Sequence, residues 1–151
     1  MRALYALADA GVAFILVGGL AAVAQGVPLV THDIDIVPSL DPANLDRLFA
    51  CLTRLNARLR GRPGAPVAPA RHHLGPGHLL LVTDQGWLDV LGTLVGGRTY
   101  ERLLEASVPL ELEGRSILVL DLAEIRAIKA ELGSPRDQAH LLLIDETLAR
   151  R

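Results

Sequence analysis

Apolar and polar residues follow different periods in the first part of the chain, and each period predicts a different element. Residues 3–10 have the spacing of a short helix that ends at Gly11. From Val12 to Val17 the chain is continuously apolar and rich in β-branched residues, as in a strand buried on both faces. A second helix is predicted over residues 20–25.

A second strand is predicted from Asp33 to Val37, because acidic and aliphatic residues alternate there with the period of a half-buried strand. Asp41 then precedes Pro42, an arrangement typical of a helix N-terminus. The leucines that follow form an amphipathic stripe, which predicts a helix to about residue 58.

Residues 60–77 contain four prolines and four glycines, a composition that excludes regular secondary structure and predicts a long loop. Two hairpins follow, separated by a short helix near residues 99–105. Their strands are predicted over residues 79–83, 87–91, 108–112 and 115–120.

Two helices are predicted at the end of the chain. Asp121 and Glu124 have the spacing of a capping box for a helix that ends at Gly133, and Ser134 precedes a proline at the start of the last helix. This order of elements predicts an α+β fold, with a mixed β-sheet, helices packed on it and two C-terminal helices. We expect one domain over residues 1–151.

Half of the residues are hydrophobic, which excludes disorder for the whole chain, and only 3% are aromatic, so the core must be aliphatic. The formal net charge is −2, but from Arg47 to Thr83 six arginines and no acidic residue give +6, which leaves −8 for the rest. A local basic surface suits a phosphate-bearing partner. The loop in this segment is predicted to contact nucleotide or an RNA backbone, with a plain surface loop as the alternative.

Cysteine content and hydropathy bear on location. Cys51 is the only cysteine, so no intrachain disulfide forms and a reducing compartment is expected. The apolar run from Val12 to Ala24 is shorter than the roughly 20 residues that cross a bilayer. We therefore expect a cytoplasmic protein without a membrane partner.

Asp33 and Asp35 are the first candidates for chemistry. On a strand they project from the same face, roughly 6–7 Å apart, while the adjacent isoleucines point into the core. Two neighbouring carboxylates repel each other unless a cation lies between them, and Mg²⁺ prefers such oxygen ligands. A solvated strand face is the alternative for this pair taken alone.

Asp89 is the third candidate. Its neighbours Leu88 and Val90 are apolar and would face inward, which leaves Asp89 on the opposite face. An acid within an apolar strand is costly unless it is paired or binds a metal, although a position at a sheet edge is an alternative. If this strand lies beside that of Asp33 and Asp35, three carboxylates converge, as two-metal phosphoryl transfer requires.

Gly18 and Gly19 stand where the first buried strand turns into a helix. Glycine lets a phosphate approach the backbone closely, and a helix N-terminus offers free N–H groups. A tight turn without a ligand is the alternative explanation of this pair.

In its combination of motifs the sequence resembles the nucleotidyltransferase superfamily of the DNA-polymerase-beta type, and in particular its minimal branch in bacterial toxin–antitoxin and abortive-infection systems. The resemblance covers most of the chain and rests on order and spacing: Val-Gly-Gly, a short helix, Thr-x-Asp-Ile-Asp and a later strand aspartate. It implies Mg²⁺ or Mn²⁺ held by Asp33, Asp35 and Asp89, and a nucleoside triphosphate such as ATP bound at Gly18 and Gly19.

The resemblance also implies roles for three further residues. Thr31 belongs to the Thr-x-Asp-Ile-Asp motif, and Lys129 and Arg136 would neutralise the β- and γ-phosphates. For Arg136, a solvated position at the start of the last helix is the alternative. The sequence departs from the branch at Leu29 and His32, where basic residues are common, and this removes positive charge beside the triphosphate site.

These features predict a metal-dependent nucleotidyltransferase that moves a nucleotide from a nucleoside triphosphate to an acceptor hydroxyl. The resemblance implies that the acceptor is a tRNA 3′ end, a protein hydroxyl or a small molecule such as an antibiotic, and that the protein is a toxin with a cognate antitoxin as partner. The second hypothesis is a non-catalytic binding module of the same fold, either an antitoxin or a subunit that recruits an acceptor-binding partner. The missing basic residues favour this alternative.

Overall fold

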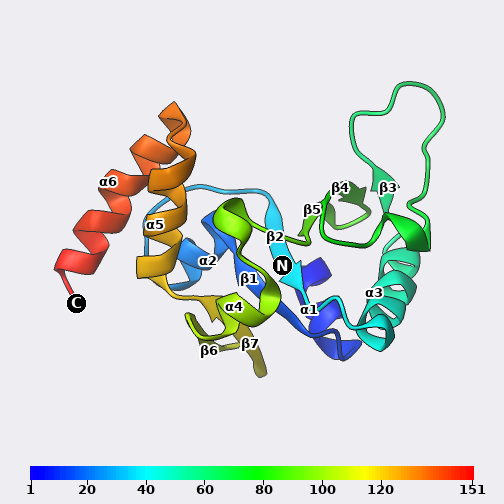
Figure 1. The fold of residues 1–151 in the computed structure, drawn as a ribbon, viewed down its shortest axis with the longest axis horizontal. Coiled ribbons are helices and arrows are strands. Elements are labelled where there is room, and N and C mark those ends of the chain that lie inside the picture. Colours follow the sequence, from blue (N-terminus) through cyan, green and yellow to red (C-terminus); the bar gives the residue numbers. More distant parts are fainter.

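The computed structural model describes residues 1–151 and contains one mixed sheet of seven strands (Figure 1). The strands are β1 (Phe14–Val17), β2 (Ile34–Pro38), β3 (Arg58–Leu59), β4 (His78–Thr83), β5 (Gly86–Leu91), β6 (Ser107–Leu112) and β7 (Arg115–Leu120). The helices are α1 (Arg2–Asp9), α2 (Gly18–Ala24), α3 (Pro42–Arg54), α4 (Tyr100–Leu104), α5 (Leu122–Leu132) and α6 (Pro135–Ala149), with short 3₁₀ helices η1 (Arg71–His73) and η2 (Val95–Gly97).

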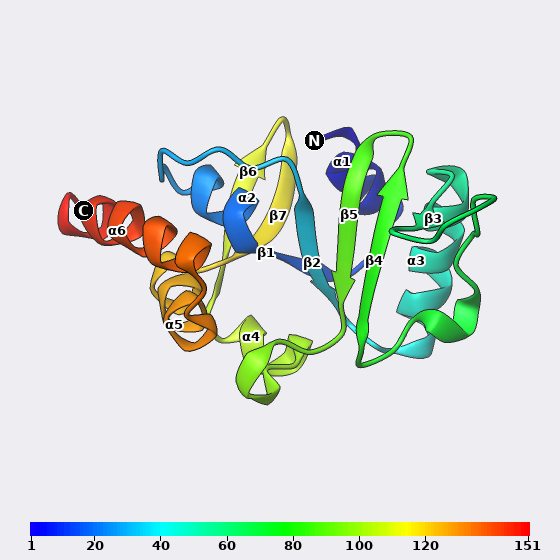
Figure 2. The ribbon, with the colours of Figure 1, turned by 90° about the horizontal axis from the view of Figure 1, so that it is seen from above.

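The strand order is β3-β4-β5-β2-β1-β7-β6, so the first two strands of the chain lie near the centre of the sheet (Figure 2). Strand β1 is antiparallel to β2 and parallel to β7, and β2 is parallel to β5. The pairs β4–β5 and β6–β7 are antiparallel hairpins. The α+β fold with a mixed sheet, as the sequence predicts, is confirmed.

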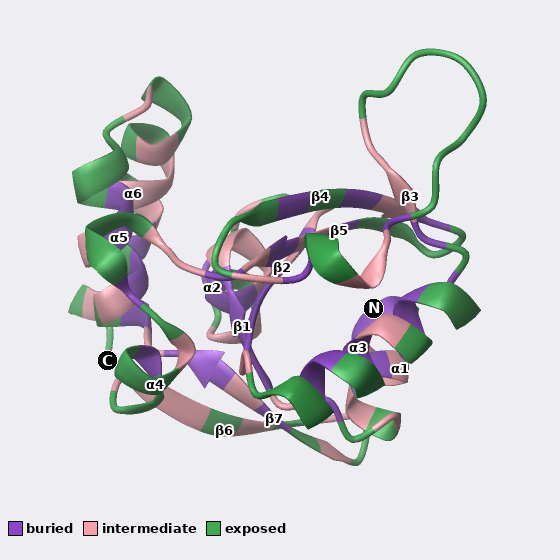
Figure 3. Cartoon of the chain, turned by 45° about the vertical axis from the view of Figure 1, so that its right-hand side comes forward, coloured by how far each residue is buried: buried purple, intermediate pink, exposed green.

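Aliphatic side chains form the core, where 33 buried residues make one hydrophobic cluster. Along β4 and β5 burial alternates: Leu81 and Leu88 are fully buried, whereas Leu80 and Trp87, on the other face, are 43% and 49% exposed. Helices α1 and α3 lie on one side of these two strands (Figure 3). The opposite face of β4 and β5 is therefore open.

Helices α5 and α6 pack against each other at one end of the molecule, and α3 with β3 lies at the other end (Figures 1 and 2). The Asp121 carboxylate caps α5 by accepting from the Ala123 N–H at 2.7 Å. The Ser134 hydroxyl caps α6 by accepting from the Asp137 N–H at 3.1 Å. None of the helices has the length and apolar character that crossing a membrane requires.

Three local expectations are wrong. Helix α3 ends at Arg54 and not near residue 58, because Asn56 takes a φ of 53° and the chain then pairs as β3 with β4. The segment 60–77 is not wholly irregular, since it contains η1. Glu124 does not complete a capping box, because its carboxylate accepts a hydrogen bond from Arg98 Nε at 2.7 Å.

Candidate functional site

The parallel pairing of β2 with β5 brings two of the predicted acids side by side, since Asp35 and Asp89 are partners in the register. Their neighbours along both strands are buried in the core, so both carboxylates project from the other face. Asp33 directly precedes β2. All three acids line one cavity of about 390 Å³.

Gly18 and Gly19 open α2 directly after β1 and line the same cavity. Gly18 has a φ of 70°, and a Cβ atom at this position would lie 2.3 Å from Asp35 Oδ2. A Cβ atom on Gly19 would lie 3.1 Å from Thr31 Oγ1. Position 18 therefore requires glycine, because a side chain would strain the backbone and displace the acid.

The Asp35 carboxyl lies in an environment that disfavours its charge. Burial raises its pKa most, and repulsion from Asp89, a hydrogen bond shared with Asp89 and repulsion from Asp33 raise the pKa further, to about 7. Lys129 acts in the opposite direction. A divalent cation would relieve this repulsion, so the oxygen donors of the three acids fit Mg²⁺ or Mn²⁺.

Asp89 has a partner that the sequence did not indicate. Arg60 Nη1 lies 2.8 Å from Asp89 Oδ1, without hydrogen-bond geometry, and the Arg60 guanidinium stacks over the Trp87 ring at 4.5 Å. As the side chains stand, no three His, Cys, Asp or Glu residues form a group that could hold a metal ion. The three acids thus share a cavity while Asp89 faces an arginine.

Lys129 and Arg136, from α5 and α6, place positive charge in the lining of the cavity. Lys129 is buried and its Nζ donates to Asp137 Oδ1 at 3.1 Å, and the Ser134 hydroxyl donates to Asp137 Oδ2 at 2.6 Å. Burial raises the pKa of Asp137, but the hydrogen bonds from Ser134 and Lys129 outweigh it and hold this pKa below its ordinary value. Arg136 has no ion pair within the chain.

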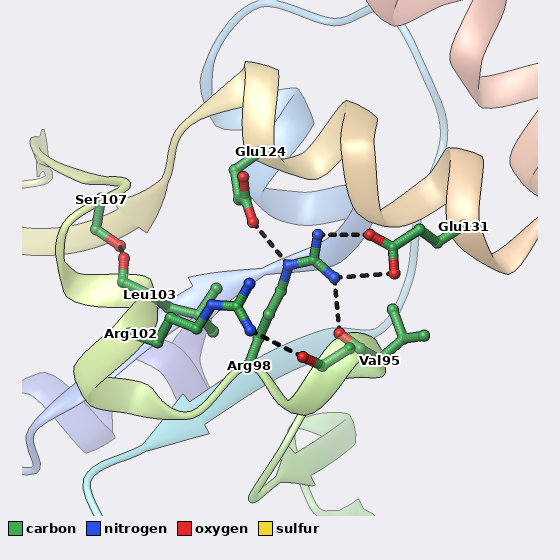
Figure 4. Close-up of polar contacts among 8 residues, drawn as sticks. Val95, Arg98, Arg102, Leu103, Ser107, Glu124 and Glu131 are labelled. Atoms are coloured by element: carbon green, nitrogen blue, oxygen red, sulfur yellow. Dashed lines mark hydrogen bonds and ion pairs between the residues drawn. The ribbon is translucent and has the colours of Figure 1, made fainter.

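Arg98 holds α5, the helix that carries Lys129, against the segment after β5 (Figure 4). Arg98 Nε donates to Glu124 at 2.7 Å, and its terminal nitrogens donate to Glu131 at 2.7 and 3.1 Å. Nη1 also donates to the Val95 carbonyl at 2.7 Å. The bond to Glu131, and then that to Glu124, raise the pKa of the guanidinium above its ordinary value. The Arg98 side chain is only 8% exposed, so this network is built around a buried charge.

Every site residue predicted from the sequence lines the cavity: Gly18, Gly19, Thr31, Asp33, Asp35, Asp89, Lys129 and Arg136. Of the two departures from the family pattern, His32 is exposed and lies outside the lining. The Leu29 side chain instead approaches Gly19, lying 3.5 Å from where a Cβ atom on that residue would stand.

Other lining residues were missed by sequence reasoning. Ser134 and Asp137 were visible only as helix-start signals, and His140 carried no signal. Burial first, and then the positive charges of Lys129 and Arg136, lower the pKa of His140. The apolar part of the lining, where aliphatic residues look the same as core residues in the sequence, consists of Val17, Leu91, Leu94, Leu120, Ile125, Ile128 and Leu132.

Neither a protein-family model nor a curated protein matches this sequence. Solved structures do match. The lincosamide antibiotic adenylyltransferase LnuA, with lincomycin bound, has a TM-score of 0.67 at 13% identity, covering 97% of this chain and 94% of LnuA. ANT(2″)-Ia in complex with adenylyl-2″-tobramycin has a TM-score of 0.60 at 16% identity, covering 97% and 86% of the two chains.

A third match is the Thermotoga maritima protein TM1012, assigned as a nucleotidyltransferase, with a TM-score of 0.59 at 21% identity over 99% of this chain and 92% of TM1012. Identities this low establish the fold alone. The resemblance to the nucleotidyltransferase superfamily that the motifs indicated is thus confirmed for the architecture. The chain has the nucleotidyltransferase fold.

Proposed function

We propose that this protein is a nucleotidyltransferase, with residues 1–151 acting as one domain. It would transfer a nucleotide from a nucleoside triphosphate such as ATP to an acceptor hydroxyl. The observation that carries the proposal is the cavity itself, in which Asp33, Asp35 and Asp89 meet Lys129 and Arg136 at the start of a helix that opens with two glycines. The likeness of fold to the two adenylyltransferases supports it.

Asp33, Asp35 and Asp89 would hold Mg²⁺ or Mn²⁺, which supplies neutralisation of the triphosphate charge and polarisation of the acceptor hydroxyl. The position of Asp35 supports this assignment, because burial first, and then repulsion from Asp89 and Asp33, raise its pKa, and a bound cation would favour the ionised carboxylate. Gly18 and Gly19 would leave room for the phosphates at the N-terminus of α2.

In the proposed reaction, the oxygen of the acceptor hydroxyl forms a bond to the α-phosphorus. The bond from that phosphorus to the oxygen that bridges to the β-phosphate breaks, and pyrophosphate leaves with the electron pair. The Asp89 carboxylate accepts the hydroxyl proton. Lys129 and Arg136 stabilise the negative charge that develops on the departing phosphates.

The acceptor and the biological setting belong to the proposal. LnuA and ANT(2″)-Ia, by their names, act on antibiotics, so a small molecule is one acceptor class, beside a tRNA 3′ end and a protein hydroxyl. A toxin with a cognate antitoxin is the setting that the motifs favour. The single cysteine, Cys51, is buried and unpaired, which suits a reducing compartment such as the cytoplasm.

The test is a labelling reaction. The purified chain is incubated with Mg²⁺ or Mn²⁺ and with each nucleoside triphosphate labelled at the α-phosphate. Three kinds of acceptor are offered in turn: total RNA, total protein and a panel of small molecules. Label is expected on one acceptor class, absent with Asp35→Ala and retained with Asp46→Asn, which changes an exposed acid on α3. Equal labelling by Asp35→Ala and the unmodified chain contradicts the mechanism.

A second function, the non-catalytic binding module, is favoured by one observation. Asp89 and Lys129 are each paired within the chain, with Arg60 and Asp137 respectively. Calorimetry separates the two functions. The module binds a co-purifying protein and shows no Mg²⁺-dependent binding of any nucleoside triphosphate, whereas the enzyme binds at least one of them.

A further inference from the structure

A second hollow lies beside the cavity, on the open face of the sheet next to β3. It has a volume of about 380 Å³, and its lining includes Arg58, Arg60, Arg62, Val82 and Trp87. We name it the arginine pocket. No acidic residue belongs to its lining. Apart from Trp87, its lining belongs to the stretch from Arg47 to Thr83 that carries the positive charge.

The arginines of this pocket are only partly neutralised. Arg58 reaches Asp84 at 3.5 Å, a carboxylate that is itself 57% exposed, and Arg62 has no ion pair. Arg58 Nε is a buried nitrogen without a hydrogen-bond acceptor, and Arg60 has Asp89 as its only ion-pair partner. Planar guanidiniums with unused donors match the oxygens of a phosphate group, which can accept two parallel N–H bonds.

Trp87 adds a flat apolar surface to this charge. It is the only tryptophan of the chain and is 49% exposed. Val82 lies directly opposite it on β4, and exposed Leu80 lies on the same open face. An exposed indole beside arginines suits a ligand that joins a ring to a phosphate, because the ring stacks while the phosphate binds the guanidiniums.

Asp89 lies between the two hollows. It lines the cavity, and its Oδ1 faces Arg60, which lines the arginine pocket. A hydroxyl-bearing molecule held in the arginine pocket would therefore present its hydroxyl at the acid that the proposed reaction uses as proton acceptor.

We propose that the arginine pocket is the acceptor subsite, and that the acceptor carries a phosphate group close to its hydroxyl. This inference rests on the proposed function and adds the chemical class of the acceptor. Three arginines repel a cationic acceptor, so polycationic small molecules are excluded from this subsite. The shared chemistry of the remaining acceptors is a phosphate, carried by an oligonucleotide end or by a small phosphorylated molecule.

Arg60 links acceptor binding to the acid cluster. A phosphate bound in the arginine pocket competes with Asp89 for the Arg60 guanidinium. When the phosphate takes this guanidinium, the Asp89 carboxylate, beside Asp35 in the register, loses its cationic partner and becomes available to a divalent cation. The acid cluster is then complete only when an acceptor is bound, which limits transfer to water in its absence.

The binding test uses the fluorescence of Trp87, because the chain contains no other tryptophan whose emission would overlap with it. A short oligoribonucleotide, a nucleoside monophosphate, the matching nucleoside and a polyamine are titrated into the full chain. The two phosphate-bearing probes are expected to change the fluorescence, and the nucleoside and polyamine to bind about tenfold more weakly or not at all. Preference for the oligoribonucleotide identifies a nucleic acid end, and equal affinity identifies a small phosphorylated acceptor.

Variants assign this signal to the pocket. Arg60→Ala and Arg62→Ala are each expected to weaken binding of the phosphate probes about tenfold. Arg54→Ala, an exposed arginine of α3 outside both hollows, should leave that binding unchanged. Arg62 is exposed, so its replacement tests the pocket even if Arg60→Ala folds poorly. Phosphate binding that responds to Lys129→Ala and not to Arg62→Ala overturns the subsite.

Metal affinity tests the link without any turnover. Calorimetric titration of Mn²⁺ should show tighter binding to Arg60→Ala than to the unmodified chain, by about threefold to tenfold, because Asp89 no longer faces a guanidinium. Unchanged or weaker Mn²⁺ binding overturns the link. Phosphate binding at Trp87 without nucleotidyl transfer contradicts only the proposed function, whereas transfer to an acceptor without phosphate contradicts only the subsite.

Discussion

The two charged regions that border the cavity are built in opposite ways. On the α5 side, each buried charge has a partner in the chain. Arg98 bonds Glu124 and Glu131, and Lys129 bonds Asp137. These bonds keep the pKa values of Glu131 and Asp137 below their ordinary range. This region is a satisfied network that fixes the position of a helix.

On the β2–β5 side, the charges are not balanced. Asp33, Asp35 and Asp89 line one cavity, and only Asp89 has a cationic partner, Arg60. Burial, and then repulsion from Asp89 and Asp33, raise the pKa of Asp35, whereas hydrogen bonds from Ser134 and Lys129 hold the pKa of Asp137, also a cavity aspartate, below its ordinary value. The comparison separates charges that are paired within the chain and stabilise the fold from unpaired charges that are candidates for binding a ligand. A charge that the chain leaves uncompensated lowers the stability of the fold unless a ligand neutralises it.

The largest effect is expected from removing the uncompensated acid. Asp35→Ala should reduce nucleotidyl transfer by roughly 10³-fold or more, because the charge that would hold the cation is lost. The measurement is initial rate with the acceptor that the labelling reaction identifies. Asp46→Asn should keep full activity. A loss below about tenfold for Asp35→Ala removes this residue from the mechanism.

Breaking the satisfied network should act on stability. Arg98→Ala should lower the free energy of unfolding by about 2–4 kcal/mol, because it leaves Glu124 and Glu131 without their buried partner. Urea denaturation followed by circular dichroism measures this loss.

Arg115→Ala is the matched control for Arg98→Ala. Arg115 also makes two bonds to one carboxylate, that of Asp9, but at an exposed site, so its replacement should lower the free energy of unfolding clearly less than Arg98→Ala does. Equal losses for the two variants would show that burial does not set the strength of these pairs.

The pH dependence of stability tests the difference between the paired charges of α5 and the unpaired Asp35. Because the pKa of Asp35 rises from 3.8 to about 7 on folding, the folded chain holds this proton more tightly than the unfolded chain. Ionised Asp35 therefore lowers stability above about pH 7, and this cost fades as the pH falls toward about 4.

Without divalent cations, Asp35→Asn should melt a few degrees above the unmodified chain at pH 8, with the difference shrinking as the pH falls. Thermal melts in a chelator across this range measure it. A pH-independent difference contradicts the raised pKa. Added Mn²⁺ should stabilise only the chain that keeps Asp35.

The smallest effect is expected from replacing Lys129, one of the two cations in the lining of the cavity. Lys129→Gln should raise the KM for the nucleoside triphosphate about tenfold, because it removes the charge that, in the proposed reaction, stabilises the phosphates. Arg126→Gln is the control on the same helix, since Arg126 is half exposed and pairs with Asp145. Steady-state kinetics compare the two, and equal KM values assign Lys129 to the fold.

Most secondary structure could be predicted because its signals are local. The caps Asp41, Asp121 and Ser134 each lie at the predicted helix starts, and Ile34 and Ile36 are buried on either side of half-buried Asp35. Prediction failed where a distant partner decides the outcome. Glu124 has the spacing of a capping residue, but Arg98, far away in the chain, takes its carboxylate.

The sequence alone predicted most of the elements in their order and the projection of Asp33 and Asp35 from one face, because period and capping act within a few residues. The tertiary structure decided that position 18 requires glycine, since a Cβ atom there would meet Asp35. Only the tertiary structure decided that Asp89 lies beside Asp35, since parallel pairing of β2 with β5 joins strands that the sequence does not connect. It likewise decided that Arg60 faces Asp89 and that Lys129 faces Asp137. Electrostatic partners are chosen by proximity in space, and strand order sets that proximity.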